Sequence, residues 1–154
     1  MSLHWAQLVH EKLAVIATFA FSQVPLQTIR TKYFVGSWPF LDKIVHDLPY
    51  EDATKALMEL ALYFRALDDK EGLTGYWKKV GTHPAVGTLT LRDGKTQPLS
   101  PREMSNKIIH AKKIDWDFPK EEPWIICTGE DKEKWVTATI NVKDLLWMGA
   151  QLGS

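Results

Sequence analysis

Hydrophobic residues in the first part of the chain recur at the three- and four-residue spacing of an α-helix. We expect a first helix that begins at a cap on Ser2 and runs to about Phe21. Val24-Pro25 should end it, because proline breaks the helical hydrogen-bond pattern. From Leu13 onward the helix is apolar on all sides, so it should lie centrally in the fold or be covered by another subunit.

The next two segments differ in how clearly they predict structure. Residues 26–37 fit a strand or a short helix equally well, and both readings stay open. Phe40 to Leu48 has the spacing of a short helix that stops before Pro49. Glu51–Leu67 is the clearest helix, because one unbroken apolar stripe runs along it. That stripe consists of Ala53, Ala56, Leu57, Leu60, Ala61, Phe64 and Leu67.

After this helix the hydrophobic period changes from helical to alternating. Residues 88–97 predict a β-hairpin with a two-residue type I′ turn at Asp93-Gly94. A helix over 100–111 should follow, and Asn141 should cap a closing helix. Three further strands are predicted at 114–118, 124–128 and 135–140. The expected fold is therefore α+β: an N-terminal part of three helices, then a small antiparallel meander with one inserted helix and a C-terminal helix, in a single domain over 1–154.

Composition narrows the classes of function. Basic and acidic residues number 19 each, so no global field attracts nucleic acid or an anionic membrane. The longest apolar stretch, Leu13 to Phe21, has nine residues, too few for the roughly 18 that span a bilayer. The single cysteine, Cys127, excludes an intramolecular disulfide and favours a reducing, cytoplasmic setting; we expect a buried, inert thiol. Seven tryptophans are many for this length and suggest an interface.

The predicted helix at 100–111 is where a strong start signal and candidate chemistry coincide. Ser100 is a good N-cap, Pro101 suits the first helical position, and Glu103 completes a capping box. One face of the helix is apolar. The opposite face carries Arg102, Glu103, Asn106 and His110. Known phosphate-binding loops, nucleophile elbows and paired-cysteine motifs are missing, so we predict no cofactor and no metal.

Asn106-Lys-Ile-Ile-His110 resembles the Arg-Asn-x-x-x-His signature of HEPN-domain proteins, an all-helical family with RNA-cleaving members. The resemblance implies that His110 and an arginine promote attack by an RNA 2′-hydroxyl on the adjacent phosphate, often at a dimer interface. Ser105 stands where the family has its arginine, so Arg102 would have to supply that cation. Helix geometry separates the Cα atoms of Arg102 and His110 by about 12 Å, against about 6 Å for Asn106 and His110.

Two functions from different classes remain as predictions. The first is a small intracellular, non-catalytic protein that self-associates or binds a protein partner, without a membrane. The alternative is a HEPN-like, metal-independent ribonuclease or an inactive relative of one, with RNA as substrate and His110, Asn106 and Arg102 as its catalytic residues. A third reading of the same three residues is structural: a hydrogen-bonding ladder along the helix.

Overall fold

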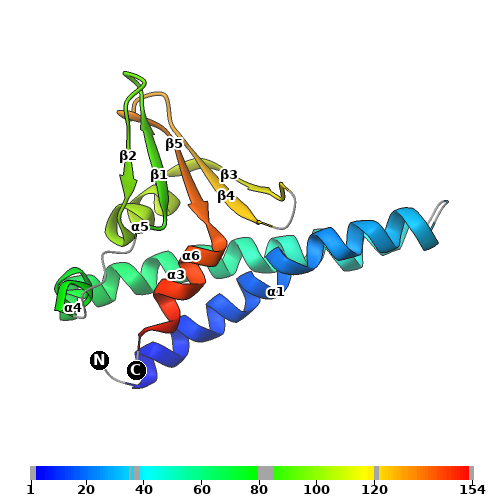
Figure 1. The fold of residues 1–154 in the computed structure, drawn as a ribbon, viewed down its shortest axis with the longest axis horizontal. Helices are drawn as coiled ribbons and strands as arrows, with labels where there is room; N and C mark the ends of the chain where they lie inside the picture. Colours follow the sequence, from blue (N-terminus) through cyan, green and yellow to red (C-terminus); the bar gives the residue numbers. More distant parts are fainter. Residues whose placement is uncertain (1–2, 35, 37–38, 80–84, 120–121, 153–154) are drawn as a thin grey trace.

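Helices and a five-stranded antiparallel sheet make up the protein, which confirms the α+β class (Figure 1). The structure is a computed structural model that describes residues 3–34, 36, 39–79, 85–119 and 122–152, so the expected cap at Ser2 lies outside it. The helical elements are α1 (Leu3–Tyr33), α2 (Pro39–Asp42), η1 (Lys43–Asp47), α3 (Leu48–Glu71), α4 (Leu73–Lys79), α5 (Pro101–Ile109) and α6 (Val142–Ala150). The strands are β1 (Gly87–Leu91), β2 (Thr96–Leu99), β3 (Ala111–Asp117), β4 (Trp124–Gly129) and β5 (Trp135–Asn141).

The first helix is longer than predicted, because α1 continues through Pro25 to Tyr33. The expected end at Val24-Pro25 is therefore wrong, and most of the ambiguous segment 26–37 is helical. Proline at position 25 removes the hydrogen bond to the carbonyl of Phe21, four residues earlier. Phe21 is exposed, so water can reach this part of the helix and solvate the unpaired carbonyl. Figure 1 shows α1 projecting well beyond the sheet.

A second proline is also carried inside continuous helical structure. The short helix expected to stop before Pro49 instead runs as α2 and η1 directly into α3, with Pro49 in its first turn. The element η1 is a π-helical turn, whose wider winding relieves the clash between a proline ring and the carbonyl four residues earlier. That carbonyl belongs to Val45, and the side-chain Nε2 of Gln23 donates to it at 3.3 Å. Gln23 thus replaces the bond that Pro49 cannot make.

The helices before the sheet number more than the three predicted. The helix α4 was not foreseen, and it follows directly on Gly72, which ends α3 with a φ of 65°. Only glycine adopts this left-handed conformation readily, so Gly72 ends α3 at Glu71, four residues after the predicted end at Leu67. The apolar stripe of α3 is buried along its whole length, as its spacing predicts.

The sheet has the strand order β2-β1-β5-β4-β3, and every neighbouring pair is antiparallel. The hairpin of β1 and β2 forms as predicted, but its turn is different. The N–H of Gly94 donates to Leu91 O at 3.0 Å and the N–H of Leu91 to Lys95 O at 2.8 Å, which defines a three-residue loop. Gly94 has a φ of 85°, the left-handed position such a loop requires.

One hydrophobic core joins the helical layer to the sheet. In Figure 1 the sheet stands over a layer formed by α1, α3 and α6, with α5 beside the sheet. The first and last helices lie against each other: His10 Nε2 is 3.1 Å from the carbonyl oxygen of Gly149, and a Cβ built on Gly149 would lie 2.2 Å from Leu13 Cδ1. The expectation of a single domain over residues 1–154 stays a prediction.

Candidate functional site

The helix α5 begins as its sequence predicts. The Ser100 hydroxyl accepts from the backbone N–H of Glu103 at 3.3 Å, and the Glu103 carboxylate accepts from the N–H of Ser100 at 3.4 Å. This capping box satisfies two backbone donors that would otherwise lack partners. Met104 and Ile108 are buried in the core, so the polar face of α5 points away from the sheet. The predicted helix end at 111 is two residues too late, because His110 is already the C-cap.

Arg102 is bound by two carboxylates of α3. Its Nη1 lies 2.5 Å from Asp68 Oδ2 and 2.9 Å from Asp69 Oδ1. Asp68 also accepts from the backbone N–H of Thr74 at 3.2 Å and from the Thr74 hydroxyl at 3.3 Å. Burial raises the pKa of Asp68, but the hydrogen bonds from Arg102 and Thr74 outweigh it and hold that pKa below its ordinary value of 3.8.

Asn106 is bound by α3 in the same way. Its Oδ1 accepts a hydrogen bond from Nη1 of Arg65. The Nε of Arg65 lies 3.7 Å from Asp69 Oδ2, so one guanidinium joins Asn106 to the carboxylates that bind Arg102. We call the set Arg65, Asp68, Asp69, Arg102 and Asn106 the α3–α5 clamp. Its contacts join two helices that are distant in the sequence.

His110 is separate from this clamp. Its backbone N–H donates to Asn106 O at 3.0 Å, but its side chain is exposed and hydrogen-bonds none of the described residues. The structure therefore joins two of the three predicted site residues, Arg102 and Asn106, to α3, a helix that the sequence did not connect to them. Their side chains bond across to α3, whereas the ladder that we predicted would run along α5 itself.

A cavity of about 470 Å³ lies beside the clamp. Arg102 and Asn106 are among its lining residues, and His110 is not. Most of its walls are apolar; they include Trp77, Pro98, Leu99 and Pro101. The indole Nε1 of Trp77 has no hydrogen-bond partner in the described residues, but it is itself buried and not open to the cavity. The cavity thus offers shape without a free reactive group.

The lone cysteine is inert, as predicted. Cys127 is buried in β4, and burial raises the pKa of its thiol to about 12. A thiol with this pKa carries almost no thiolate near neutral pH, and the thiolate is the nucleophilic form. Among the residues that the structure describes, no group of three or more histidine, cysteine, aspartate or glutamate side chains is arranged to hold a metal ion.

The most unusual surface of the molecule lies on the part of α1 that projects from the body. There α1 runs antiparallel to α2, η1 and the start of α3: Arg30 pairs with Asp42 near the tip, and Lys12 pairs with Glu59 at 2.6 Å near the base. We call the hairpin of residues 21–33 and 39–49 the arm. A groove of about 550 Å³ lies where the arm joins the body, between α1 and the segment from η1 to the start of α3, and is lined by Val15, Leu26, Ile44 and Val45, among others.

Large exposed apolar side chains lie in this groove and farther along the same two helical segments; Val15 and Ile44 line the groove itself. Between 40% and 68% of each of the following is exposed: Val15, Ile29, Tyr33, Ile44 and Leu48. We call these five residues the groove face. Val15, Ile29 and Tyr33 share one side of α1, while Ile44 and Leu48 come from the second segment of the arm. Sequence spacing could have indicated this face, but reading Pro25 as a helix end hid it.

The fold and this surface define an α+β protein with a projecting, partly apolar helical arm. The chain matches no family model, no curated protein and no solved structure. The resemblance of Asn106 and His110 to the HEPN signature therefore stays a prediction. None of the described helices is long and apolar enough to cross a membrane.

Proposed function

We propose that this protein is a non-catalytic, self-associating protein whose arm docks on the arm of a second copy. The observation that carries the proposal is the groove face, five large apolar side chains left in contact with water on a projecting pair of helices. Single exposed apolar residues are common on soluble proteins, but several large ones on two neighbouring helical segments, two of them lining a groove, are typical of an interface.

The apolar area of the groove face matches what one side of a dimer needs. A standard interface buries about 800 Å² per partner, of which roughly 60% is apolar, so on the order of 500 Å². Five large side chains, each about half exposed, supply on the order of 100 Å² apiece. The groove face therefore provides most of the apolar part of such an interface.

The charges of the arm favour a second copy as the occupant. Arg30 is paired with Asp42 within one chain, and the other charged side chains of the arm, Lys32, Lys43 and Asp47, carry both signs. The whole chain has a formal net charge of zero. Two identical copies therefore meet without the long-range repulsion that a strongly charged surface would create.

The shape of the arm allows a closed, symmetric dimer. Two antiparallel helical hairpins that pack their apolar faces together form a four-helix bundle. A two-fold axis through the groove places the same residues on both sides and leaves no groove face open to a third copy. The proposal therefore expects dimers and no longer chains of molecules.

The test is the mass of the protein in solution, measured by sedimentation over a range of concentrations, for the parent and two variants. Ile44→Asp puts a charge in the groove face, and we expect its dimer dissociation constant to rise at least about 100-fold. Trp147→Asp is the matched control, because Trp147 is exposed to a similar extent on α6, outside the arm. We expect the control to remain dimeric.

Two results would overturn the proposal. One is a monomeric parent at every accessible concentration. The other is a dimer that Trp147→Asp dissociates and Ile44→Asp leaves intact, which would move the interface to α6. Circular dichroism on both variants checks that neither has unfolded, and Ile44 is exposed enough that its replacement costs little core packing.

The ribonuclease alternative receives no support from the geometry of α5. Arg102 and Asn106 are engaged by α3, and the exposed His110 lies outside the neighbouring cavity. It therefore stays a prediction from the sequence.

A further inference from the structure

A second cavity of the arm, of about 560 Å³, lies on a different side of α1 from the groove. Its polar lining comes from Gln23, Gln27 and Arg30 on α1 and from Asp42, His46 and Asp47 on the facing segment. Phe118, just after β3, supplies an aromatic wall. We call this the polar pocket. Its lining is distinct from the groove face, so occupation of one surface does not require the other.

Gln23 contributes a hydrogen-bond acceptor that no described protein group uses. Only 8% of the residue is exposed, and its Nε2 is fixed by donating to Val45 O. Its Oε1 hydrogen-bonds none of the described residues and is not among their fully buried, unpaired atoms. This oxygen is therefore open to the pocket that Gln23 lines, and a donor that enters the pocket can hydrogen-bond it.

His46 is held in one orientation and offers a second acceptor. Its Nδ1 lies 3.1 Å from Asp47 Oδ1, and its ring stacks on Tyr50 with centroids 5.8 Å apart and planes at 22°. Because a carboxylate only accepts, Nδ1 carries the proton, and in the neutral imidazole Nε2 is left as an acceptor. The ring of Phe19 also packs against His46, with its centroid 6.1 Å from that of the imidazole.

The charges of the pocket favour a cation. Arg30 is neutralised by Asp42, which leaves the carboxylate of Asp47 as the uncompensated charge when His46 is neutral. The unused groups are thus mainly acceptors: Gln23 Oε1, His46 Nε2 and the free oxygens of Asp42 and Asp47. The face of an aromatic ring such as Phe118 also attracts cations and packs against alkyl stems.

The backbone that builds this pocket is of an uncommon kind. Asp42 precedes the π-helical turn, and His46 and Asp47 belong to it. Such turns cost stability and occur frequently at functional sites. Here the turn follows from Pro49, and it sets His46 opposite Gln23 on α1.

We propose that the polar pocket binds an organic cation, an alkylammonium or alkylguanidinium group whose N–H donors meet Gln23, His46 and Asp47 and whose stem lies against Phe118. The same chemistry belongs to a free amine and to a lysine or arginine side chain. It does not depend on dimerisation, because the pocket is lined by one chain.

The experiment titrates four probes of equal stem length, n-butylguanidinium, n-butylammonium, n-butanol and butyrate, into the ¹⁵N-labelled protein. The readout is the NMR signals of the Gln23 side-chain amide and the His46 ring. We expect both cations to shift these signals saturably, and butanol and butyrate to leave them unchanged. A blocked Gly-Arg-Gly peptide that binds more tightly than n-butylguanidinium would assign the site to a side chain, and weaker binding would assign it to a free amine.

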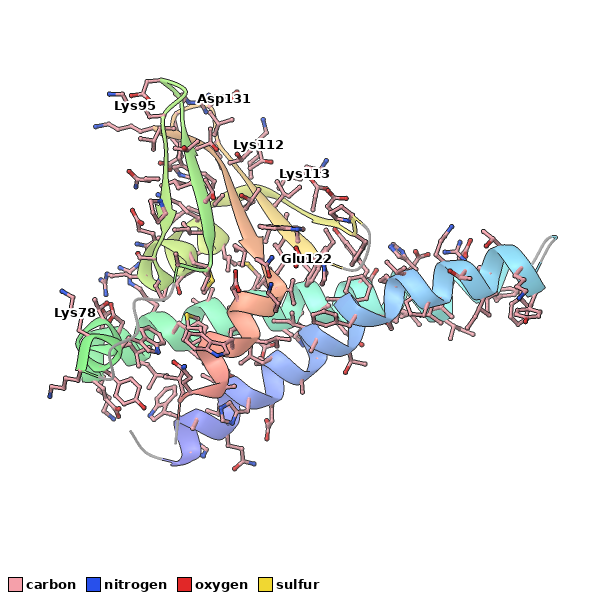
Figure 2. The ribbon with its side chains drawn as sticks, viewed as in Figure 1. Lys78, Lys95, Lys112, Lys113, Glu122 and Asp131 are labelled. Carbon is pink, nitrogen blue, oxygen red and sulfur yellow. The ribbon has the colours of Figure 1, made fainter. Side chains whose placement is uncertain are left out.

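Charge-matched variants test the residues. Asp47→Asn removes the uncompensated charge from an exposed position and should weaken cation binding at least tenfold. Asp131→Asn makes the same change at the tip of the sheet, far from the arm in Figure 2, and should leave binding unchanged. Gln23→Met, compared at matched thermal stability, should also weaken it. Equal binding of butyrate, no saturable shift with either cation, or equal weakening by Asp131→Asn would overturn the proposal.

Discussion

Arg102 and Asn106 show how a side chain's role depends on what it meets across the fold. Both lie on the polar face of α5, and the ribonuclease alternative predicts them as catalytic residues. In the structure α3 supplies a carboxylate pair for Arg102 and the guanidinium of Arg65 for Asn106. A hydrogen bond to a charged group is stronger than one between neutral groups. The α3–α5 clamp is therefore a structural feature of the molecule.

Stability measurements separate the clamp from His110. We expect Asn106→Ala to lower the free energy of unfolding by about 1–3 kcal/mol, because Arg65 loses its partner. His110→Ala should change it by less than about 0.5 kcal/mol, because that side chain is exposed and hydrogen-bonds none of the described residues. Urea unfolding of both variants tests this, and a larger loss for His110→Ala than for Asn106→Ala would contradict it.

Asp68 makes part of the stability depend on pH. Its folded pKa lies below the ordinary value, so its contribution is fully present above the unfolded pKa of about 3.9 and is lost as the pH falls through the lower folded pKa. We expect the parent to lose more stability than Asp68→Asn as the pH falls from about 5 toward 2. Asp131→Asn, made in an exposed loop, should follow the parent. Denaturant unfolding at several pH values provides the comparison.

Some residue contacts could be predicted locally and others could not. The capping box of Ser100 and Glu103 lies within four residues, and the sequence identifies it. Asp68 and Asp69 lie three and four residues after Arg65, the spacing at which side chains pair on one helix. The structure keeps Arg65 near Asp69 but gives Asp68 to Arg102, 34 residues away. A pair of that separation leaves no periodic signal in the chain.

At the scale of elements, apolar periodicity predicted the helices and strands well, but the prolines led to wrong predictions of where helices end. The stripe of α3 and the strand pattern of the sheet appear where expected. Pro25 and Pro49 were both taken as helix ends, and both are carried within helical structure. Each leaves one carbonyl unpaired. Water can reach the first, and Gln23 bonds the second, which no rule based on neighbouring residues could foresee.

Two leucines of α3 test the stripe directly. Leu60 is fully buried, and Leu60→Ala should lower the free energy of unfolding by about 2–5 kcal/mol through the cavity it leaves. Leu62→Ala is the control, because 53% of Leu62 is exposed on the same helix; it should cost less than about 1 kcal/mol. Chemical denaturation measures both, and similar losses would show that the face had been misassigned.

At the scale of the whole molecule, different sides of α1 lie in different environments. The sequence shows the second half of the predicted first helix as apolar on all sides. In the structure Leu13 and Ile16 lie in the core, while Val15 faces the groove. The fold class could be predicted from the order of the elements. The projection of the arm could not, because it depends on where α3 and the sheet end. That relation is set by packing between distant segments, so the sequence alone could not place the groove face or the polar pocket.

The contact of α1 with α6 bears on how the protein is made. Gly149, against which Leu13 packs, is added to the chain more than 130 residues after it. At about 5–20 residues per second, translation keeps these two apart for on the order of ten seconds. During that interval the α6-facing side of α1 is an exposed apolar surface on a nascent chain. Chaperone shielding of this side of α1 would therefore matter until α6 has been synthesised.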